Sequence, residues 1–173
     1  MSWARVGYNA IILLFFFVIQ ESAISKINFP ISGFSLYLCA LIGLMALEDR
    51  FGAIALGFGG GIILDLSPSS DSPFGKWAFI LTIVGYLFSR NRESIGDFTT
   101  SPVSFILFVS AGITATLLIF LSLGVILGEN NGSVLANLQT ILGNAIWSLI
   151  FASILLPGLV KVRSFALTSR ERT

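Results

Sequence analysis

The stretch Gly-Phe-Gly-Gly-Gly-Ile-Ile-Leu-Asp, residues 57–65, sets four glycines and one carboxylate inside an apolar run that has the composition of a membrane helix. Glycine adds little hydrophobicity toward lipid, and an aspartate within hydrocarbon is costly. Both residue types are favourable where a helix packs against protein instead of lipid. The stretch therefore predicts a helix-packing centre inside a membrane protein.

The composition of the whole chain agrees with a membrane protein. Of its 173 residues, 55% are hydrophobic and only 11% are charged, and the mean hydropathy is +0.91. A soluble domain carries about 25% charged residues. No polar stretch is long enough for a separate soluble domain, and the net charge of +1 gives no reason to expect a nucleic-acid partner.

The apolar segments predict an all-α, polytopic protein with a compact bundle of six transmembrane helices within residues 1–160. The predicted spans are approximately residues 4–24, 31–47, 51–66, 74–89, 103–127 and 138–159. A span needs about 20 residues, so the fifth and sixth segments qualify easily, whereas the third and fourth are short. A re-entrant excursion formed by the third and fourth segments is the alternative. Residues 161–173 are predicted to form a basic cytoplasmic tail.

The lysines and arginines predict the orientation. With a cytoplasmic N-terminus, six spans place all basic residues except Lys26 and Lys76 on the inner side, as the positive-inside rule requires. Both termini are then cytoplasmic. Charge alone does not exclude the re-entrant alternative. Four aromatic side chains are predicted to anchor at the lipid headgroups: Trp3, Tyr8, Trp77 and Tyr86.

The spacing of small residues predicts a packing face on the third segment. Gly57 and Gly61 are four residues apart and share one helix face, and Asp65 follows at the same spacing. Small residues at this spacing let two helix backbones approach closely, although such a pattern is common by chance. The spacing does not decide whether the partner helix belongs to the same chain or to another protein.

Asp65 has two interpretations. It either begins the turn over residues 67–73, or it faces the bundle and pairs with a polar group there. An acid near a helix C-terminus is disfavoured by the helix dipole, so we expect a stabilising partner. Lys76 or Arg50 is a charged partner only if the fold brings it close. Among the other polar residues within the spans, Gln20 and Asn144 are the better candidates for hydrogen bonds between helices.

The residue types argue against an enzyme. The chain has no histidine and one cysteine, Cys39, which lies in an apolar run and is expected to be buried and inert. Histidine is the commonest general base and metal ligand. The glycines are not a Walker loop, because Ile62 follows them where such a loop has Lys and then Ser or Thr. We therefore predict no catalytic residue, no cofactor and no metal.

Short motifs in a fixed order resemble the rod shape-determining protein MreD family, in the form found in high-GC Gram-positive bacteria. The motifs are Gly57-x-x-x-Gly61-x-x-x-Asp65, a Pro/Ser turn, Gly75-Lys76-Trp77-Ala78 and Val84-Gly85-Tyr86-Leu87. They lie within residues 52–90, less than a quarter of the chain, and Lys76-Trp77 stands where Leu-His is commoner. Two further features resemble the ends of the family's first and second helices: Gln20-x-Ser22 and Pro30.

The resemblance implies a non-enzymatic scaffold subunit of the cell-elongation machinery in the bacterial cytoplasmic membrane. Its implied partners are an MreC-like bitopic membrane protein and, through it, a RodA-type polymerase with its transpeptidase and MreB-like filaments. The implied helix-packing or partner-interface residues are Gly57, Gly61, Asp65, Gly75, Gly85, Tyr86 and Gln20.

A more distant similarity implies an alternative function. The family is similar to the substrate-binding membrane components of energy-coupling-factor transporters, so the chain is alternatively a small-molecule-binding component of a vitamin-type transporter. That function needs a cavity lined by several polar groups. The candidate residues for such a lining are Asp65, Asn144 and Gln20.

Overall fold

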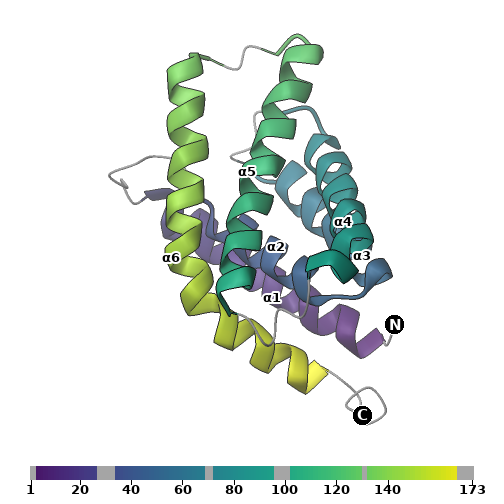
Figure 1. Ribbon diagram of the computed structural model, residues 1–173. Coiled ribbons are helices and arrows are strands. Elements are labelled where there is room, and N and C mark those ends of the chain that lie inside the picture. The colour runs from purple at the N-terminus through teal and green to yellow at the C-terminus, as the bar shows by residue number, and fades with distance from the viewer. Residues whose placement is uncertain (1–2, 27–33, 69–71, 96–101, 130–131, 167–173) are drawn as a thin grey trace.

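The computed structural model of the protein describes residues 3–26, 34–68, 72–95, 102–129 and 132–166 (Figure 1). Every regular element in these residues is a helix, which confirms the predicted all-α class. The elements are α1 (Trp3–Ser22), the 3-10 turn η1 (Ile24–Lys26), α2 (Leu36–Leu47), α3 (Arg50–Asp65), α4 (Lys76–Ile95), α5 (Pro102–Ile126) and α6 (Val134–Ala166).

Each predicted span corresponds to one α-helix, but three boundaries differ by five residues or more. Helix α4 continues to Ile95, six residues beyond the predicted end of its span at residue 89. Helix α6 continues to Ala166, so residues 161–166 of the predicted basic tail are helical and continuous with the last predicted span. Helix α2 begins at Leu36 rather than at residue 31, because Ser35 accepts a hydrogen bond from the backbone of Leu38 and caps the helix there. Residues 27–33 and 167–173, where the other parts of these predictions fall, lie outside the described residues.

Three described stretches are long and apolar enough to cross a membrane: Gly7–Lys26, Pro102–Ile126 and Val134–Leu155. Helix α2 has 12 residues and α3 has 16, which correspond to lengths of about 18 Å and 24 Å. Both are shorter than the roughly 30 Å of bilayer hydrocarbon. Helix α4 has 20 residues but carries charged side chains at both ends.

Helix α2 is the centre of the fold (Figure 1). It contacts each of the other five α-helices, and all of its twelve residues are buried, including the thiol of Cys39. A helix that is apolar on every face is expected to be enclosed by protein. The sequence Leu-Tyr-Leu-Cys-Ala-Leu-Ile-Gly-Leu-Met-Ala-Leu of α2 is of that kind, and this explains its central place.

Two antiparallel hairpins pack around this centre. Helices α3 and α4 make the most extensive contact in the molecule, and α5 and α6 make the next. The connection between α5 and α6 lies at one end of the molecule, and the start of α1 and the end of α6 lie near the other end (Figure 1). Large apolar side chains remain exposed on the outside of both hairpins, among them Phe58, Phe79, Leu118 and Ile154. An exposed apolar surface of this kind is suited to contact with lipid or with another protein.

Candidate functional site

The glycine face of α3 packs directly on the backbone of α4. A Cβ atom built on Gly57 would lie well inside 3.0 Å of the carbonyl oxygen of Leu81, and one on Gly61 would meet the backbone of Ala78 equally closely. From the opposite side, a Cβ on Gly85 would lie 2.6 Å from the carbonyl oxygen of Ala53. The close-packed face therefore meets another helix of the same chain.

The other two glycines of the 57–65 stretch face different surroundings. Gly60 lies against the side chain of Leu41 in α2, and its carbonyl oxygen accepts a hydrogen bond of 2.9 Å from the hydroxyl of Tyr37. Gly59 is exposed, and a Cβ atom added to it would meet no neighbouring atom within 4 Å. The glycines of this stretch therefore face three sides of α3: Gly57 and Gly61 face α4, Gly60 faces α2, and Gly59 faces the outside of the molecule.

Asp65 joins the end of α3 to the start of α4. Its Oδ1 accepts a hydrogen bond of 3.0 Å from the backbone N–H of Trp77, and its Oδ2 accepts one of 3.0 Å from Ala78. A carboxylate at a helix N-terminus satisfies donors that have no partner within the helix and complements the helix dipole. The stabilising partner expected for Asp65 is therefore the backbone of α4.

The backbone conformation of Gly75 allows the chain to turn so that Asp65 can cap the start of α4. The φ angle of Gly75 is +93°, a conformation that residues with a Cβ adopt only at a cost. The turn it forms brings the chain back so that α4 starts beside the end of α3. Gly75 thus acts in the α3–α4 connection.

The possible charged partners of Asp65 bind elsewhere. Lys76 is 4% exposed, and its Nζ donates a hydrogen bond to Oε2 of Glu129 and lies 3.7 Å from the centre of the Phe120 ring. The guanidinium of Arg50 lies 5.5 Å from the centre of the Tyr86 ring. Sequence reasoning missed Glu129, because an acid in a Gly-Glu-Asn turn carries no signal that it reaches a buried lysine.

Trp77 lies inside the bundle. Its ring stacks on Phe120 with ring centres 4.2 Å apart and packs against the core. The ring of Trp77 is therefore partly buried in contacts within the protein, whereas the sequence predicted it as an anchor at the lipid headgroups. The ring is held between α4 and α5 by stacking, which is favourable beyond the burial of its area. Tyr8 and Tyr86 are exposed, as headgroup anchors require, and the side chain of Trp3 lies outside the described residues.

The N-terminus of α2 is satisfied by side chains from three places in the chain. Oε1 of Gln20 accepts a hydrogen bond of 2.8 Å from the N–H of Leu36, and Oδ1 of Asn144 accepts one of 2.9 Å from the N–H of Ser35. Oγ of Ser35 accepts from Leu38. These bonds confirm the predicted interhelical roles of Gln20 and Asn144. Sequence reasoning missed Ser35, which a search for N-cap residues before an apolar run would have found.

The opposite end of the bundle carries a second polar cluster. Nδ2 of Asn9 donates a hydrogen bond of 3.1 Å to Oε1 of Glu48, and both side chains are buried. Asp49 caps α3 by accepting a hydrogen bond of 2.7 Å from the N–H of Gly52. The structure therefore does not bring all predicted interface residues together. Gln20, Asp65 and Gly75 lie toward one end of the molecule, whereas Tyr86 lies toward the other with Arg50.

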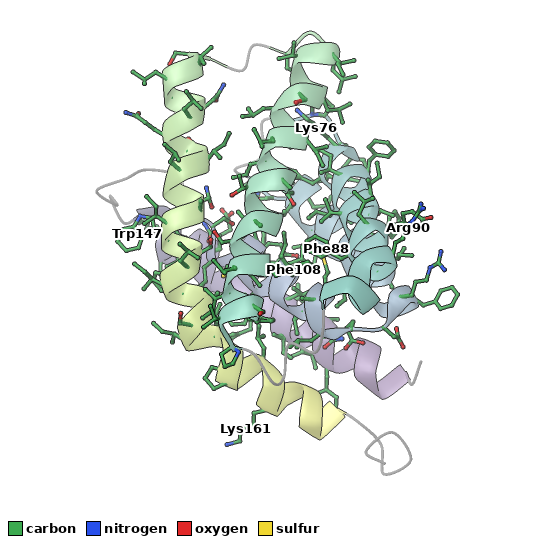
Figure 2. The ribbon with its side chains drawn as sticks, viewed as in Figure 1. Lys76, Phe88, Arg90, Phe108, Trp147 and Lys161 are labelled. Carbon is green, nitrogen blue, oxygen red and sulfur yellow. The ribbon has the colours of Figure 1, made fainter. Side chains whose placement is uncertain are left out.

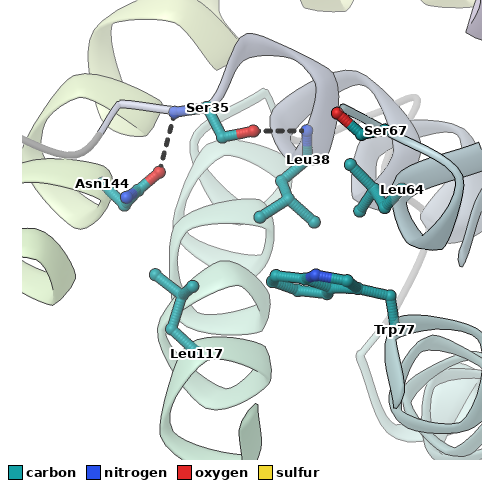
Figure 3. A pocket seen from close by; sticks show the side chains of 7 residues that line it. All are labelled: Ser35, Leu38, Leu64, Ser67, Trp77, Leu117 and Asn144. Carbon is teal, nitrogen blue, oxygen red and sulfur yellow. Dashed lines mark hydrogen bonds between the residues drawn. The ribbon is translucent and has the colours of Figure 1, made fainter. Parts of the chain in front are cut away.

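A half-open cavity of about 200 Å³ lies among five helices near the start of α2 and α4 (Figure 3). Ser35, Asn144 and Ser67 supply its polar atoms. Its apolar lining consists of Leu38, Leu64, Trp77 and Leu117. Of the three residues expected for a ligand cavity, only Asn144 is part of the lining. Both oxygens of Asp65 are occupied by the α4 cap, and the carbonyl of Gln20 by the α2 cap.

Within the described residues, no three Cys, Asp or Glu side chains are grouped closely enough to hold a metal ion. No family model, no curated protein and no solved structure matches the chain. The resemblance to the MreD family therefore depends on the sequence motifs, and the geometry shows what those residues do in this chain.

Replacing Gln20 with leucine is expected to lower the free energy of unfolding by about 1–3 kcal/mol, because a buried backbone donor at Leu36 loses its acceptor. Amide hydrogen exchange at the first turn of α2 should become faster at the same time. The matched control is Gln139→Leu, since Gln139 is exposed on α6. Equal stability and equal exchange in the two variants would contradict the capping role of Gln20.

Proposed function

We propose that α1 to α6 are six membrane crossings of a protein of the bacterial cytoplasmic membrane, with both termini in the cytoplasm. Helices α3 and α4 are each continuous and pair along their length, which favours two crossings over a re-entrant excursion. Lys161 lies at the end of the molecule opposite Lys76 (Figure 2). Lys76, which the positive-inside rule disfavours on the outer side, is paired with Glu129 there.

We propose further that the protein is a non-enzymatic scaffold subunit of the cell-elongation machinery, as its resemblance to the MreD family implies. One observation carries this proposal. The residues of the family motif act together in a single structural unit, the α3–α4 hairpin: Gly57, Gly61 and Gly85 allow the close approach, and Gly75 and Asp65 form the connection.

A partner must then bind outside the glycine face, because that face is occupied by α4. On the outer side of α3, Ala55 and Gly59 are exposed small residues four positions apart, beside the exposed ring of Phe58. Small residues at this spacing leave room for a further helix to approach. The single membrane helix of an MreC-like partner is the occupant we propose for this outer side of α3.

Co-purification with the MreC-like protein, co-expressed in a native-like membrane, tests the proposal. We expect the two proteins to purify together, with Gly59→Leu reducing the recovered partner about tenfold by filling the space that a helix needs. The matched control is Ala115→Leu, a substitution at an exposed small residue of α5, which should leave recovery unchanged. No association of the wild-type pair would overturn the scaffold function. Equal recovery with Gly59→Leu would overturn only the outer α3 side as the contact.

The vitamin-type transporter function is less well supported by the geometry. Pockets for drug-sized ligands have volumes of about 300–1,000 Å³, whereas the cavity near Trp77 has about 200 Å³. All three polar residues expected to line it are used as helix caps, and of these only Asn144 also belongs to the lining. The cavity is thus too small for most vitamins, although it has room for a smaller molecule.

A further inference from the structure

The cavity near Trp77 has walls from five helices. Leu38 comes from α2, Leu64 from α3, Trp77 from α4, Leu117 from α5 and Asn144 from α6. Figure 3 shows Trp77 extending toward Leu117, with Leu38 and Leu64 together on one side of its ring. Phe120 stacks on the indole, so the ring is fixed in place. A fixed aromatic ring with aliphatic neighbours is a suitable wall for another flat ring.

Two hydrogen-bond donors remain at the polar side of this cavity. Oδ1 of Asn144 accepts from Ser35, and its Nδ2 donates to the carbonyl of Thr140, which leaves one amide N–H with no hydrogen-bond partner among the described residues. Oγ of Ser35 accepts from Leu38, so its own proton is available for donation. The third polar residue is already engaged, because the hydroxyl of Ser67 donates to Glu21.

The lining of the cavity includes polar residues, and this distinguishes the cavity from an empty packing defect. Empty cavities in proteins are lined by apolar groups only, whereas a cavity with polar groups and enough room holds water or a ligand. An engineered apolar cavity of about 150 Å³ accommodates benzene, so a volume of about 200 Å³ has room for one ring with a small substituent. Among the described residues, no charged side chain belongs to the lining, and burying an ion without a paired charge is strongly unfavourable.

We propose that this cavity binds an uncharged molecule of about one ring that carries a hydrogen-bond acceptor, such as an aromatic amide. The ring lies against Trp77 between Leu38 and Leu117, and the acceptor oxygen receives hydrogen bonds from Ser35 and Asn144. This binding site is independent of the scaffold function, since it uses neither the outer side of α3 nor the membrane partner.

Benzamide is a direct probe of the site. We expect ligand-detected saturation-transfer NMR with the full chain in lipid nanodiscs to show saturable benzamide binding that empty nanodiscs do not show. Toluene lacks the acceptor and benzoate carries a charge, so both should bind at least about tenfold more weakly. This comparison uses only the wild-type protein, and therefore holds even if a cavity variant does not fold.

A cavity-filling variant locates the binding. Leu117→Phe should weaken benzamide binding about tenfold or more by occupying the space. The matched control, Leu118→Phe, alters the adjacent residue, which is 51% exposed on the outside of α5, and should bind benzamide as the wild type does. Absence of saturable benzamide binding, equal binding by Leu117→Phe, or equal binding of benzoate would each overturn the proposal.

Discussion

Replacing Gly57 with alanine is expected to lower the free energy of unfolding by about 3 kcal/mol, at the upper end of what overpacking a well-packed core usually costs. The added Cβ would meet the carbonyl oxygen of Leu81, which is backbone and cannot move aside as a flexible side chain does. Helix α3 would have to move away from α4 along its length. Equilibrium unfolding of the purified protein in mixed detergent micelles measures the change.

Gly59→Ala is the matched control for this substitution. Gly59 lies two residues further along the same helix, and an added Cβ there would meet no atom of the described residues within 4 Å outside its own stretch of helix. Alanine at that position is expected to raise the stability by about 0.4–1 kcal/mol, because it reduces the freedom of the unfolded chain. The two substitutions thus change stability in opposite directions. Equal stability of the two variants would contradict the close contact of α3 with α4.

Replacing Asp65 with alanine is expected to lower the free energy of unfolding by about 2–4 kcal/mol. It removes both acceptors of the α4 cap and leaves the N–H groups of Trp77 and Ala78 without partners. Unfolding measurements in mixed micelles give the size of the loss. Faster amide hydrogen exchange at the first turn of α4 is expected to show that the loss of stability arises at this cap.

Asp65→Asn separates the geometry of this cap from its charge. The asparagine side chain keeps one acceptor oxygen but cannot accept both bonds, and it loses the attraction between the carboxylate and the helix dipole. We expect a loss of stability about half as large as that of the alanine variant. Wild-type stability in both variants would show that Asp65 does not cap α4.

The six helices and their order could be predicted from the sequence, because polar turns separate the apolar runs, but several helix ends differ from the ends of those runs. The face formed by Gly57 and Gly61 could also be predicted, since a four-residue spacing places both on one side of a helix. The helix that covers this face could not be predicted, because the spacing of the glycines does not indicate which helix packs against them. The partner of Asp65 could not be predicted either. Its carboxylate accepts hydrogen bonds from backbone N–H groups, and because every residue except proline has such a group, the sequence does not indicate which ones.

The cavity could not be predicted for a different reason. Its volume depends on how Leu38, Leu64, Trp77 and Leu117 pack where five helices meet, and none of these residues is unusual in an apolar segment. Sequence reasoning did select Asn144, because an amide within a span requires a partner. It missed Ser35, because the predicted span of residues 31–47 placed this serine inside the helix rather than at its N-cap.

The cap of α2 has a consequence for the order of events at the ribosome. Asn144, which accepts the hydrogen bond of Ser35, follows it by 109 residues. At a synthesis rate of about 5–20 residues per second, it is made about 5–20 s later. Gln20, by contrast, is already present when Leu36 emerges. The backbone N–H of Ser35, at the start of the central helix, therefore has no Asn144 acceptor until α6 has been translated. The polar contacts of the first half of the chain are complete only after the last helix has been made.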